Sequence, residues 1–316
     1  MTLLPCTSSV PMPGVREMSI ASRRRFQLAV LLGPVSAFLA VFFLGPLAIM
    51  VVTSLLAPGL YGGVEWTFYP HNFGRILGFA DPMFEEFDPI YIAIFLRSVE
   101  IAALTVLATL LVCYPAAFCI ARLSERWKNF CLFLITLPFF TSLIVRLFVW
   151  VLILRQTGLV NEMLLSTGLI ERPLDLIYTK GAIILGMTYV FIPFMFMPVY
   201  ASVEKLDWTL VRASLDLGAG PLRTFWRIIL PLTAPGIAGG AVIVFIPALG
   251  NFVVPAVLGG AKVMMFGNLI EQQFLAARNW PFGAALAMMV MTVMLIMMIA
   301  HVVLSGRRSA AAALAR

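Results

Sequence analysis

Few side chains in this chain have the type and spacing that covalent or metal chemistry requires. The sequence contains no GxxxxGK motif followed by Ser or Thr, so it lacks the loop that cradles the phosphates of a bound nucleotide. It also lacks a nucleophile elbow and a catalytic dyad within its apolar segments. The two histidines, His71 and His301, do not stand at ligand spacing to a cysteine, and the four cysteines show no paired spacing. We therefore expect no catalytic centre, metal site or disulfide framework.

The polar side chains of interest lie in or beside long apolar runs. Glu100 lies at the start of one run, where a charge is costly in lipid unless it faces protein or a water-filled cavity. It could therefore line a pathway, or it could form a salt bridge to Arg97 or Arg146. Asn251 stands beside a glycine and between prolines, where it could line a pathway or hydrogen-bond to another helix.

The composition is that of a membrane protein. Apolar residues make up 61% of the chain and charged residues 12%, against roughly half and a quarter in soluble domains. Six runs are long enough to cross a hydrocarbon core at about twenty residues each, and lipid requires that they be helices. They are residues 27–55, 99–121, 130–154, 181–203, 232–258 and 283–305. The sequence predicts an all-α polytopic protein whose first helix is retained as an anchor and not cleaved.

Lys and Arg residues set the expected orientation of these helices. The two termini and the loops after the second and fourth runs hold more of them than the remaining loops do, which places both termini in the cytosol. The domain organisation is then a cytosolic tail at 1–26, a six-helix transmembrane domain at 27–305 and a second cytosolic tail at 306–316. The net charge of +7 suits contact with lipid headgroups. No basic cluster is interleaved with stacking aromatics, so nucleic-acid binding is not expected.

The outer loops have recognisable local patterns. Residues 57–92 should form a compact cap with a short interfacial helix, and residues 155–180 should hold a short apolar segment that lies flat on the membrane. Residues 259–282 contain apolar side chains at helical spacing, with Glu271 beside them, which predicts a short amphipathic helix. Several prolines fall inside the apolar runs and should kink or interrupt helices, either to gate a pathway or as irregular packing. These are Pro115, Pro138, Pro193, Pro198 and Pro247.

A polar segment separates the fourth and fifth apolar runs. Asp207 can cap a helix that Gly218 ends, because glycine accepts the left-handed backbone found there. Pro221 then opens a second short helix, and Pro231 and Pro235 should end it and begin the next span. Two short helices joined at a glycine would form a rigid knob.

This segment resembles the EAA loop of ATP-binding-cassette (ABC) importer permeases, a cytosolic loop placed here at residues 204–231. The family pattern is Glu-Ala-Ala, three residues, Gly, and then about nine residues before Ile-x-Leu-Pro. The glycine and the closing proline match at Gly218 and Pro231. Arg212 replaces the family's acid and Ser214 its second alanine. The resemblance therefore implies docking by shape around Gly218 and argues against a specific salt bridge at Arg212.

Three further segments are similar to the spermidine/putrescine permease subunits of that group. They are residues 137–146 (LPFFTSLIVR), 246–260 (IPALGNFVVPAVLGG) and 259–285. The resemblance covers most of the chain and implies the MetI-like permease fold of type I ABC importers in a bacterial inner membrane. It also implies an ABC ATPase dimer that binds ATP and Mg, a second homologous permease subunit, a periplasmic solute-binding protein and surrounding lipid. The chain itself would hold no cofactor.

The resemblance assigns roles to residues as well. The ATPase-coupling loop would comprise Arg212, Ala213, Ser214, Asp216, Gly218, Ala219, Phe225 and Pro231. Polyamines are polycations, so their pathway needs carboxylates, carbonyls and aromatic faces in place of water. The pathway candidates are Glu100, Tyr189, Asn251 and Glu271, with Trp150 as a second aromatic face.

Other functions stay open at this point. Within transport, the solute could be an opine, iron or another amine, because the motifs of this group do not determine the substrate. Outside it, a self-contained channel or an intramembrane enzyme would need a repeated polar stripe or a buried catalytic pair. The sequence has neither, so alternating access driven by a separate ATPase is the function we expect.

Overall fold

The computed structural model of the chain describes residues 20–79, 87–260 and 262–314. The predicted tail at 1–26 falls largely outside these residues. The chain comprises two compact units, Met1–Met50 and Val51–Arg316. The described part is mostly helical, as the sequence predicted.

The described residues of the first unit belong to a long, largely apolar helix that begins at Ile20 and continues to Ser54. Helix α1 (Ile20–Leu39) passes through a π-helical turn, η1 (Ala40–Leu44), into α2 (Gly45–Ser54). Every residue from Val30 to Leu44 is exposed. A helix that is apolar on all sides is typical of a membrane span, because lipid can cover each of its faces.

The second unit begins with a small cap. Strands β1 (Leu56–Pro58) and β2 (Val64–Phe68) pair antiparallel and are followed by α3 (His71–Ile76). The buried Asn72 side chain donates hydrogen bonds to the carbonyls of Ser54 and Leu56, both at 3.0 Å, and so holds α3 against the hairpin. The predicted cap with a short helix is confirmed for these residues, while 80–86 lie outside the described residues.

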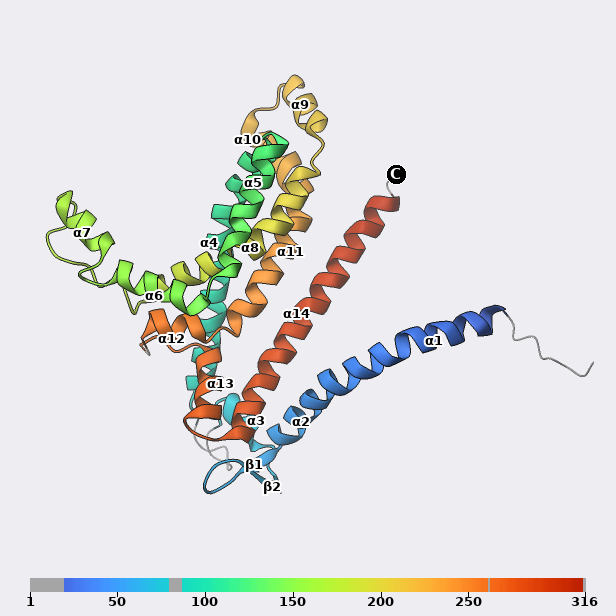
Figure 1. Cartoon of the computed structure of the whole chain (residues 1–316), viewed down its shortest axis with the longest axis vertical. Helices are drawn as coiled ribbons and strands as arrows, with labels where there is room; N and C mark the ends of the chain where they lie inside the picture. Colours follow the sequence, from blue (N-terminus) through green and yellow to red (C-terminus); the bar gives the residue numbers. More distant parts are fainter. Residues whose placement is uncertain (1–19, 80–86, 261, 315–316) are drawn as a thin grey trace, which may run out of the picture. The chain divides into compact units, whose positions relative to one another are not determined.

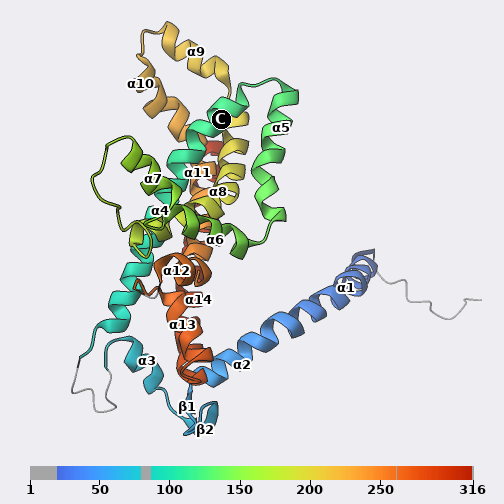
Figure 2. The same cartoon turned by 60° about the vertical axis from the view of Figure 1, so that its left-hand side comes forward.

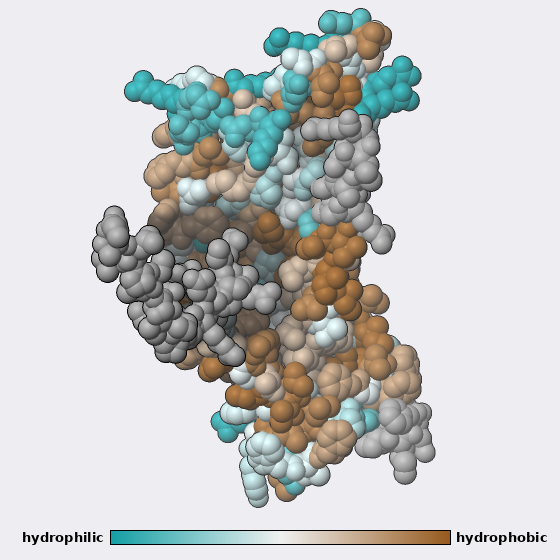
Figure 3. Space-filling view, turned by 90° about the vertical axis from the view of Figure 1, so that its right-hand side faces the viewer, coloured by the Kyte–Doolittle hydropathy of each residue, from teal (hydrophilic) through white to brown (hydrophobic). Residues whose placement is uncertain are grey.

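The remaining helices of the second unit form a bundle with two different ends (Figures 1 and 2). In both views α4, α8 and α11 lie side by side, α9 and α10 lie at one end, and α13 and α3 lie toward the other. Hydrophilic residues gather at the α9–α10 end, and the faces next to it are largely apolar (Figure 3). The elements are α4 (Ile90–Ala121), α5 (Glu125–Thr136), η2 (Leu137–Phe140), α6 (Leu143–Leu154), α7 (Leu159–Ser166), α8 (Lys180–Glu204), α9 (Trp208–Asp216), α10 (Pro221–Thr224), η3 (Phe225–Ile229), α11 (Leu230–Leu249), α12 (Val253–Gly259), α13 (Phe266–Leu275) and α14 (Trp280–Leu314).

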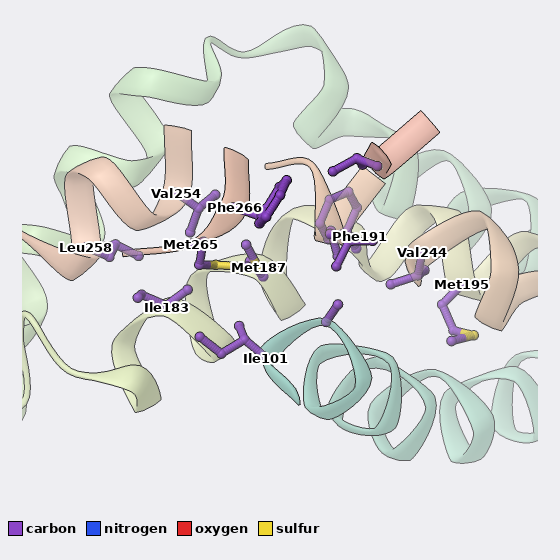
Figure 4. Close-up of a cluster of buried hydrophobic side chains, with 14 of the residues drawn as sticks. Ile101, Ile183, Met187, Phe191, Met195, Val244, Val254, Leu258, Met265 and Phe266 are labelled. Carbon is purple, nitrogen blue, oxygen red and sulfur yellow. The ribbon is translucent and has the colours of Figure 1, made fainter. Parts of the chain in front are cut away.

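Helix α8 is the centre of the core. Half of its most apolar stretch is buried, a larger share than in any other spanning segment described. Figure 4 shows its Ile183, Met187 and Phe191 among side chains from α4, α11, α12 and α13. Close approach of α11 depends on Gly236 and Gly240, where a methyl group would meet α8 atoms. Small residues four apart let membrane helices pack backbone to backbone.

Six segments are long and apolar enough to cross a membrane, as predicted. They are Val30–Ser54, Ile90–Ala121, Leu143–Ser166, Lys180–Glu204, Pro221–Leu249 and Trp280–Val303. The third prediction, a continuous helix over 130–154, was wrong. Helix α5 ends at Thr136, and a 3₁₀ turn containing Pro138 and an extended Thr141 separate it from α6. Proline lacks an N–H donor and favours such a break, whereas Pro115, Pro193 and Pro198 lie within continuous helices.

The fifth span also differs from its prediction. The helix does not end at Pro231, because α10, η3 and α11 are continuous from Pro221 to Leu249. The turn before Pro231 is π-helical, which widens the helix where the proline ring cannot share the usual hydrogen bond. The span instead breaks three residues after Pro247, at Gly250–Phe252, before α12 begins.

The short helices predicted within residues 155–180 and 259–282 are present. Helix α7 covers the apolar segment expected between 155 and 180, and α13 covers the amphipathic segment around Glu271. Leu269 is buried on α13, whereas Glu271 is partly exposed. The apolar spacing read from the sequence therefore identified the buried face of α13 correctly.

Candidate functional site

In the loop between α8 and α11, the first predicted short helix is present as α9, whereas the second, α10, is the start of the continuous helix from Pro221 to Leu249. Asp207 caps α9 by accepting hydrogen bonds from the backbone N–H and the hydroxyl of Thr209, at 2.9 and 2.7 Å. These bonds, the hydroxyl's first, hold the pKa of Asp207 below its usual value. Gly218 follows α9 with a φ of 81°. Its N–H donates to Leu215 O and the N–H of Ala219 to Ser214 O, the pair of bonds that ends a helix in a Schellman motif.

A direct hydrogen bond joins the two short helices. The hydroxyls of Ser214 on α9 and Thr224 on α10 lie 3.0 Å apart, and Thr224 is buried. The residue that replaces the second alanine of the family pattern therefore has a specific contact within the loop. Ser214 stiffens the knob that the sequence predicts.

A groove of about 420 Å³ opens between α9 and α10, and we call it the loop groove. Its lining is Leu210, Ala213, Ser214, Leu217, Ala219, Arg223, Arg227 and Ile228. Leu217 and Leu222, on the surface around it, are 89% and 71% exposed. Arg212, also on α9, is exposed but does not line the groove. A hollow apolar surface with basic residues around it is suited to receive part of another protein.

Aromatic rings connect this loop to α4. The ring of Trp208, the first residue of α9, lies 6.2 Å from that of Phe118 on α4. Phe118 lies 5.0 Å from Tyr114, whose ring is 5.9 Å from Phe225 in the π-helical turn. The Tyr114 hydroxyl also lies 3.0 Å from the Thr233 hydroxyl. Helix α4 thus contacts the loop where it leaves α8 and again where it enters α11.

A charged cluster lies at the same end of the bundle. Lys128 of α5 donates hydrogen bonds to Glu125 at 2.8 Å and to Glu204 at 3.3 Å. The carboxylates, Glu125 first, raise the pKa of Lys128. The Tyr200 hydroxyl donates to Glu204 at 2.8 Å. The cluster joins the start of α5 to the last turn of α8, directly before the loop.

Glu100 has a basic partner that the sequence did not identify. The Lys180 ammonium donates to both carboxylate oxygens of Glu100, at 3.1 and 3.3 Å. The alternative of a salt bridge was correct in kind, but the expected partners, Arg97 and Arg146, were wrong. Glu100 also lies within α4 and not at its start, because that helix begins at Ile90. Both side chains of the pair are about half exposed, at 50% and 49%.

Asn251 and Glu271 come from one region of the bundle. Asn251 lies in the break after α11, where its side-chain oxygen accepts a hydrogen bond from Val254 N at 3.0 Å. Helix α13 packs against this break, and Asn268 donates to Phe252 O at 2.9 Å. One turn further, Glu271 lines a pocket of about 260 Å³ that Asn268 also lines. The buried Oδ1 of Asn268 has no hydrogen-bond partner among the described residues.

Tyr189 and Trp150 form an aromatic pair between α8 and α6. Their ring centroids are 5.8 Å apart in an edge-to-face arrangement. The Arg146 guanidinium carbon lies 5.9 Å from the Tyr189 ring centre, so one protein cation already lies near this pair. Within the described part of the chain, the ring contacts of Tyr189 are with Trp150 and Arg146, and not with Glu100, Asn251 or Glu271. The four predicted pathway residues therefore occupy three places: the Lys180 ion pair, the break beside α13, and the aromatic pair.

The candidate residues form a loop surface at one end of the bundle and polar or aromatic contacts between its helices. The described residues include no group of three or more His, Cys, Asp and Glu side chains that could hold a metal ion. Sequence reasoning missed Lys180, Trp208 and Phe118, although a Tyr and a Phe four residues apart on α4 indicate a shared helix face. Their partners could not be read from spacing, because they come from distant segments.

Comparisons with known proteins agree with this architecture. Residues 114–310 match the family described as "Binding-protein-dependent transport system inner membrane component". The chain is 38% identical over 277 residues to the spermidine/putrescine transport system permease protein PotB of Salmonella typhimurium (strain SL1344), covering 88% of this chain and 93% of that protein. It is 39% identical over 264 residues to PotB of Escherichia coli (strain K12), covering 84% and 92%.

A solved structure shares the fold at low sequence identity. It is the crystal structure of a bacterial alginate ABC transporter in complex with an alginate pentasaccharide-bound periplasmic protein. The match has a TM-score of 0.67 at 17% identity and covers 88% of this chain and 93% of the other. The family match spans most of the second unit, and the relatives are covered almost completely. This chain is a multi-pass membrane protein with the MetI-like ABC permease fold, and it belongs to the family of inner membrane components of binding-protein-dependent transport systems.

Proposed function

We propose that this chain is the permease subunit of an ATP-driven ABC importer and forms part of a translocation pathway for spermidine and putrescine. The observation that carries the proposal is the 38% identity to a spermidine/putrescine permease over 93% of that protein's length. The described structure adds carboxylates and aromatic faces in the membrane-embedded bundle, which suit ammonium groups. Transport would proceed by alternating access.

The proposed complex contains proteins besides this chain. An ABC ATPase dimer binds ATP and Mg, a second homologous permease completes the pathway, and a periplasmic binding protein delivers the solute. The solved alginate transporter, which carries a periplasmic protein, supports such partners in general. In the orientation we propose, both termini and the α9–α10 end face the cytosol, and the cap and α13 face the periplasm.

The loop groove is the proposed docking surface for the ATPase. Its exposed leucines would be buried by that subunit, while Gly218 and the Ser214–Thr224 bond keep the knob rigid. Arg212, Ala213, Asp216 and Ala219 lie on the same short segment. Phe225 and Pro231 belong to the continuous helix that follows. Docking by shape is consistent with Arg212 in place of the family's acid.

The proposed pathway uses Glu100, Tyr189, Asn251 and Glu271. The pocket beside α13 offers the Glu271 carboxylate and the unpaired Oδ1 of Asn268 as acceptors for an ammonium group. Burying a cation without such partners is costly, so these acceptors would replace part of its hydration. Gln substitution of Glu271 would remove the charge while preserving the shape.

The experiment that tests the proposal is uptake and ATP hydrolysis by the complete complex in liposomes, with its binding protein. Spermidine, putrescine and unrelated solutes are compared, and a complex with an ATPase-dead nucleotide-binding subunit is the control. ATP-dependent uptake of a polyamine alone would support the proposal. Uptake of a different solute would retain the importer and refute the substrate, and uptake without ATP would refute the importer.

A further inference from the structure

The ion pair between Glu100 and Lys180 joins two helices at an accessible position. Lys180 donates to both oxygens of the Glu100 carboxylate, at 3.1 and 3.3 Å, across eighty residues of sequence. The two side chains are 50% and 49% exposed. Ion pairs with this much exposure are weak and exchange readily with other ions, since water competes for each partner.

Apart from Arg97, three residues earlier, the large side chains around Glu100 on this helix face are apolar. Leu96, Leu104, Leu107 and Leu111 recur at helical spacing around it and are exposed by 40% to 66%. A carboxylate within such a stripe does not face hydrocarbon without a large cost, so it faces protein or a water-filled path. Under the proposed function, which this inference requires, that path is the one shared with the second permease.

The backbone that carries Glu100 is fixed more tightly by its surroundings than the charged end of Lys180 is. Glu100 is followed by Ile101 and Ala102, which are completely buried, and Ile101 lies in the core beside Ile183 and Met187 (Figure 4). The Ser98 hydroxyl, two residues before Glu100, accepts a hydrogen bond from Phe266 N at 2.7 Å and joins α4 to α13. The backbone under Glu100 is therefore rigid, which keeps its carboxylate in place.

Lys180 is held less firmly at its charged end. It is the first residue of α8, whose start is capped by Thr179 accepting from Ala182 N at 3.2 Å. The positive end of a helix dipole lies there and disfavours a cation. The ammonium itself is carried by a flexible four-carbon chain. Lys180 can therefore leave the carboxylate without disturbing either helix.

We propose that Lys180 is a tethered counter-ion that occupies Glu100 when no solute is bound, and that a primary ammonium of the transported polyamine displaces it. The exchange replaces one alkylammonium group with another, because a lysine side chain and the end of a polyamine carry the same group. The carboxylate is then neutralised in both states.

Tethering also accounts for selection of polycations. Because the Lys180 ammonium is attached to the protein, its effective concentration near Glu100 is high. A free monoamine or sodium ion, which carries a single charge, cannot compete with it for the carboxylate. A diamine or triamine has further charges that reach other acceptors, so it competes successfully. Lys180 is thus a specificity-determining residue, and Glu100 is the residue that contacts the solute.

The test measures equilibrium binding of radiolabelled putrescine to the permease–ATPase complex in nanodiscs, without the binding protein. A site that is free about one quarter of the time, as a weak exposed ion pair allows, loses about fourfold in apparent affinity. Lys180→Gln should therefore bind putrescine about fourfold more tightly than wild type and should also bind butylamine. Glu100→Gln should bind neither, and the double variant should behave like Glu100→Gln because Lys180 acts only through that carboxylate.

Other outcomes would overturn the proposal. A purely structural ion pair predicts that both single variants weaken binding and that the double variant recovers part of the loss. Lys262→Gln is the matched control, since Lys262 is an exposed lysine in another loop of the same end. Equal tightening by Lys262→Gln would attribute the effect to general surface charge, and absence of saturable binding by Lys180→Gln would also refute the proposal. ATP-dependent polyamine uptake by the wild-type complex, measured in parallel, shows whether the proposed function itself has failed.

Discussion

The ring of Trp208 lies 6.2 Å from the ring of Phe118, with the two planes at 85°. Trp208 begins α9, and Phe118 lies one turn before the end of α4. Edge-to-face pairs of this kind contribute about 1 kcal/mol beyond the area they bury. The contact connects the loop that the ATPase is proposed to move with the helix that carries Glu100.

Removal of this contact should separate ATP hydrolysis from transport. In Trp208→Ala, a loss of about 1 kcal/mol in the coupling corresponds to a roughly fivefold drop in solute moved per ATP hydrolysed. Trp208→Phe should retain most of the coupling because it keeps a ring at this position. The measurement is the ratio of uptake to hydrolysis in liposomes. Trp127→Ala, an exposed tryptophan of α5, is the control, and an unchanged ratio in Trp208→Ala would refute the role.

The effect of substituting Gly218 should depend on the backbone conformation that the new residue prefers, and not on the room available for its side chain. Its φ is 81°, and an added Cβ would meet nothing within 4 Å. Gly218→Ala should lower stimulated ATP hydrolysis and cost about 1 kcal/mol of loop stability, because alanine disfavours this conformation. Gly218→Asn should cost less, since asparagine adopts it more readily. Gly220→Ala, equally open but with φ near −67°, should be neutral; a loss of ATPase stimulation as large as that of Gly218→Ala would contradict this explanation.

The packing of α11 on α8 should depend on Gly236. A Cβ at this position would meet the Pro198 carbonyl and the Ser202 side chain. Gly236→Ala should therefore destabilise the protein by about 2 kcal/mol, because backbone atoms cannot move aside as side chains do. Gly239→Ala, which meets nothing within 4 Å, should leave stability unchanged or raise it slightly. Thermal unfolding in detergent compares the two, and equal midpoints would disprove the close-packing argument.

Acid should weaken the start of α9. Hydrogen bonds from Thr209 lower the pKa of Asp207 from its usual 3.8. Because the pKa of Asp207 is lower in the folded state than in the unfolded state, its carboxylate contributes fully to stability at pH values above the usual pKa. This stabilisation is lost as the pH falls through the lowered pKa. Asp207→Asn keeps an acceptor oxygen without the titration. The difference in unfolding midpoint between wild type and Asp207→Asn should therefore change in acid, and a difference that stays constant down to about pH 2 would contradict the cap assignment.

The features that sequence could predict are those governed by local rules. Six spans follow from the length of the apolar runs, and the helix cap at Asp207 and the helix end at Gly218 follow from backbone and capping preferences. The break at Leu137–Phe140 could not be predicted in this way. Pro138 lies in a run that stays apolar on both sides, and prolines are also accommodated within the continuous helices α4 and α8. Hydropathy alone cannot distinguish these cases.

Contacts between helices that lie far apart in the sequence could not be predicted from local sequence patterns. Glu100 was identified because a charge is costly within a membrane. Its partner Lys180 lies eighty residues away in the sequence, at the start of α8. The faces of α4 and α8 that meet depend on packing of the whole core, which a single sequence does not reveal. For the same reason, the aromatic contact of Trp208 with Phe118 could not be foreseen.

The π-helical turn before Pro231 gives the fifth span an unusual mechanical property. Because the turn accommodates the proline without a break, Pro221–Leu249 is one helical rod of 29 residues. At about 1.5 Å per residue the rod is roughly 43 Å long. A tilt of about 10° at its loop end would carry the opposite end through roughly 7 Å. If the ATPase moves the loop as proposed, the rod would act as a lever arm that converts a small displacement at its loop end into a larger one beside Asn251.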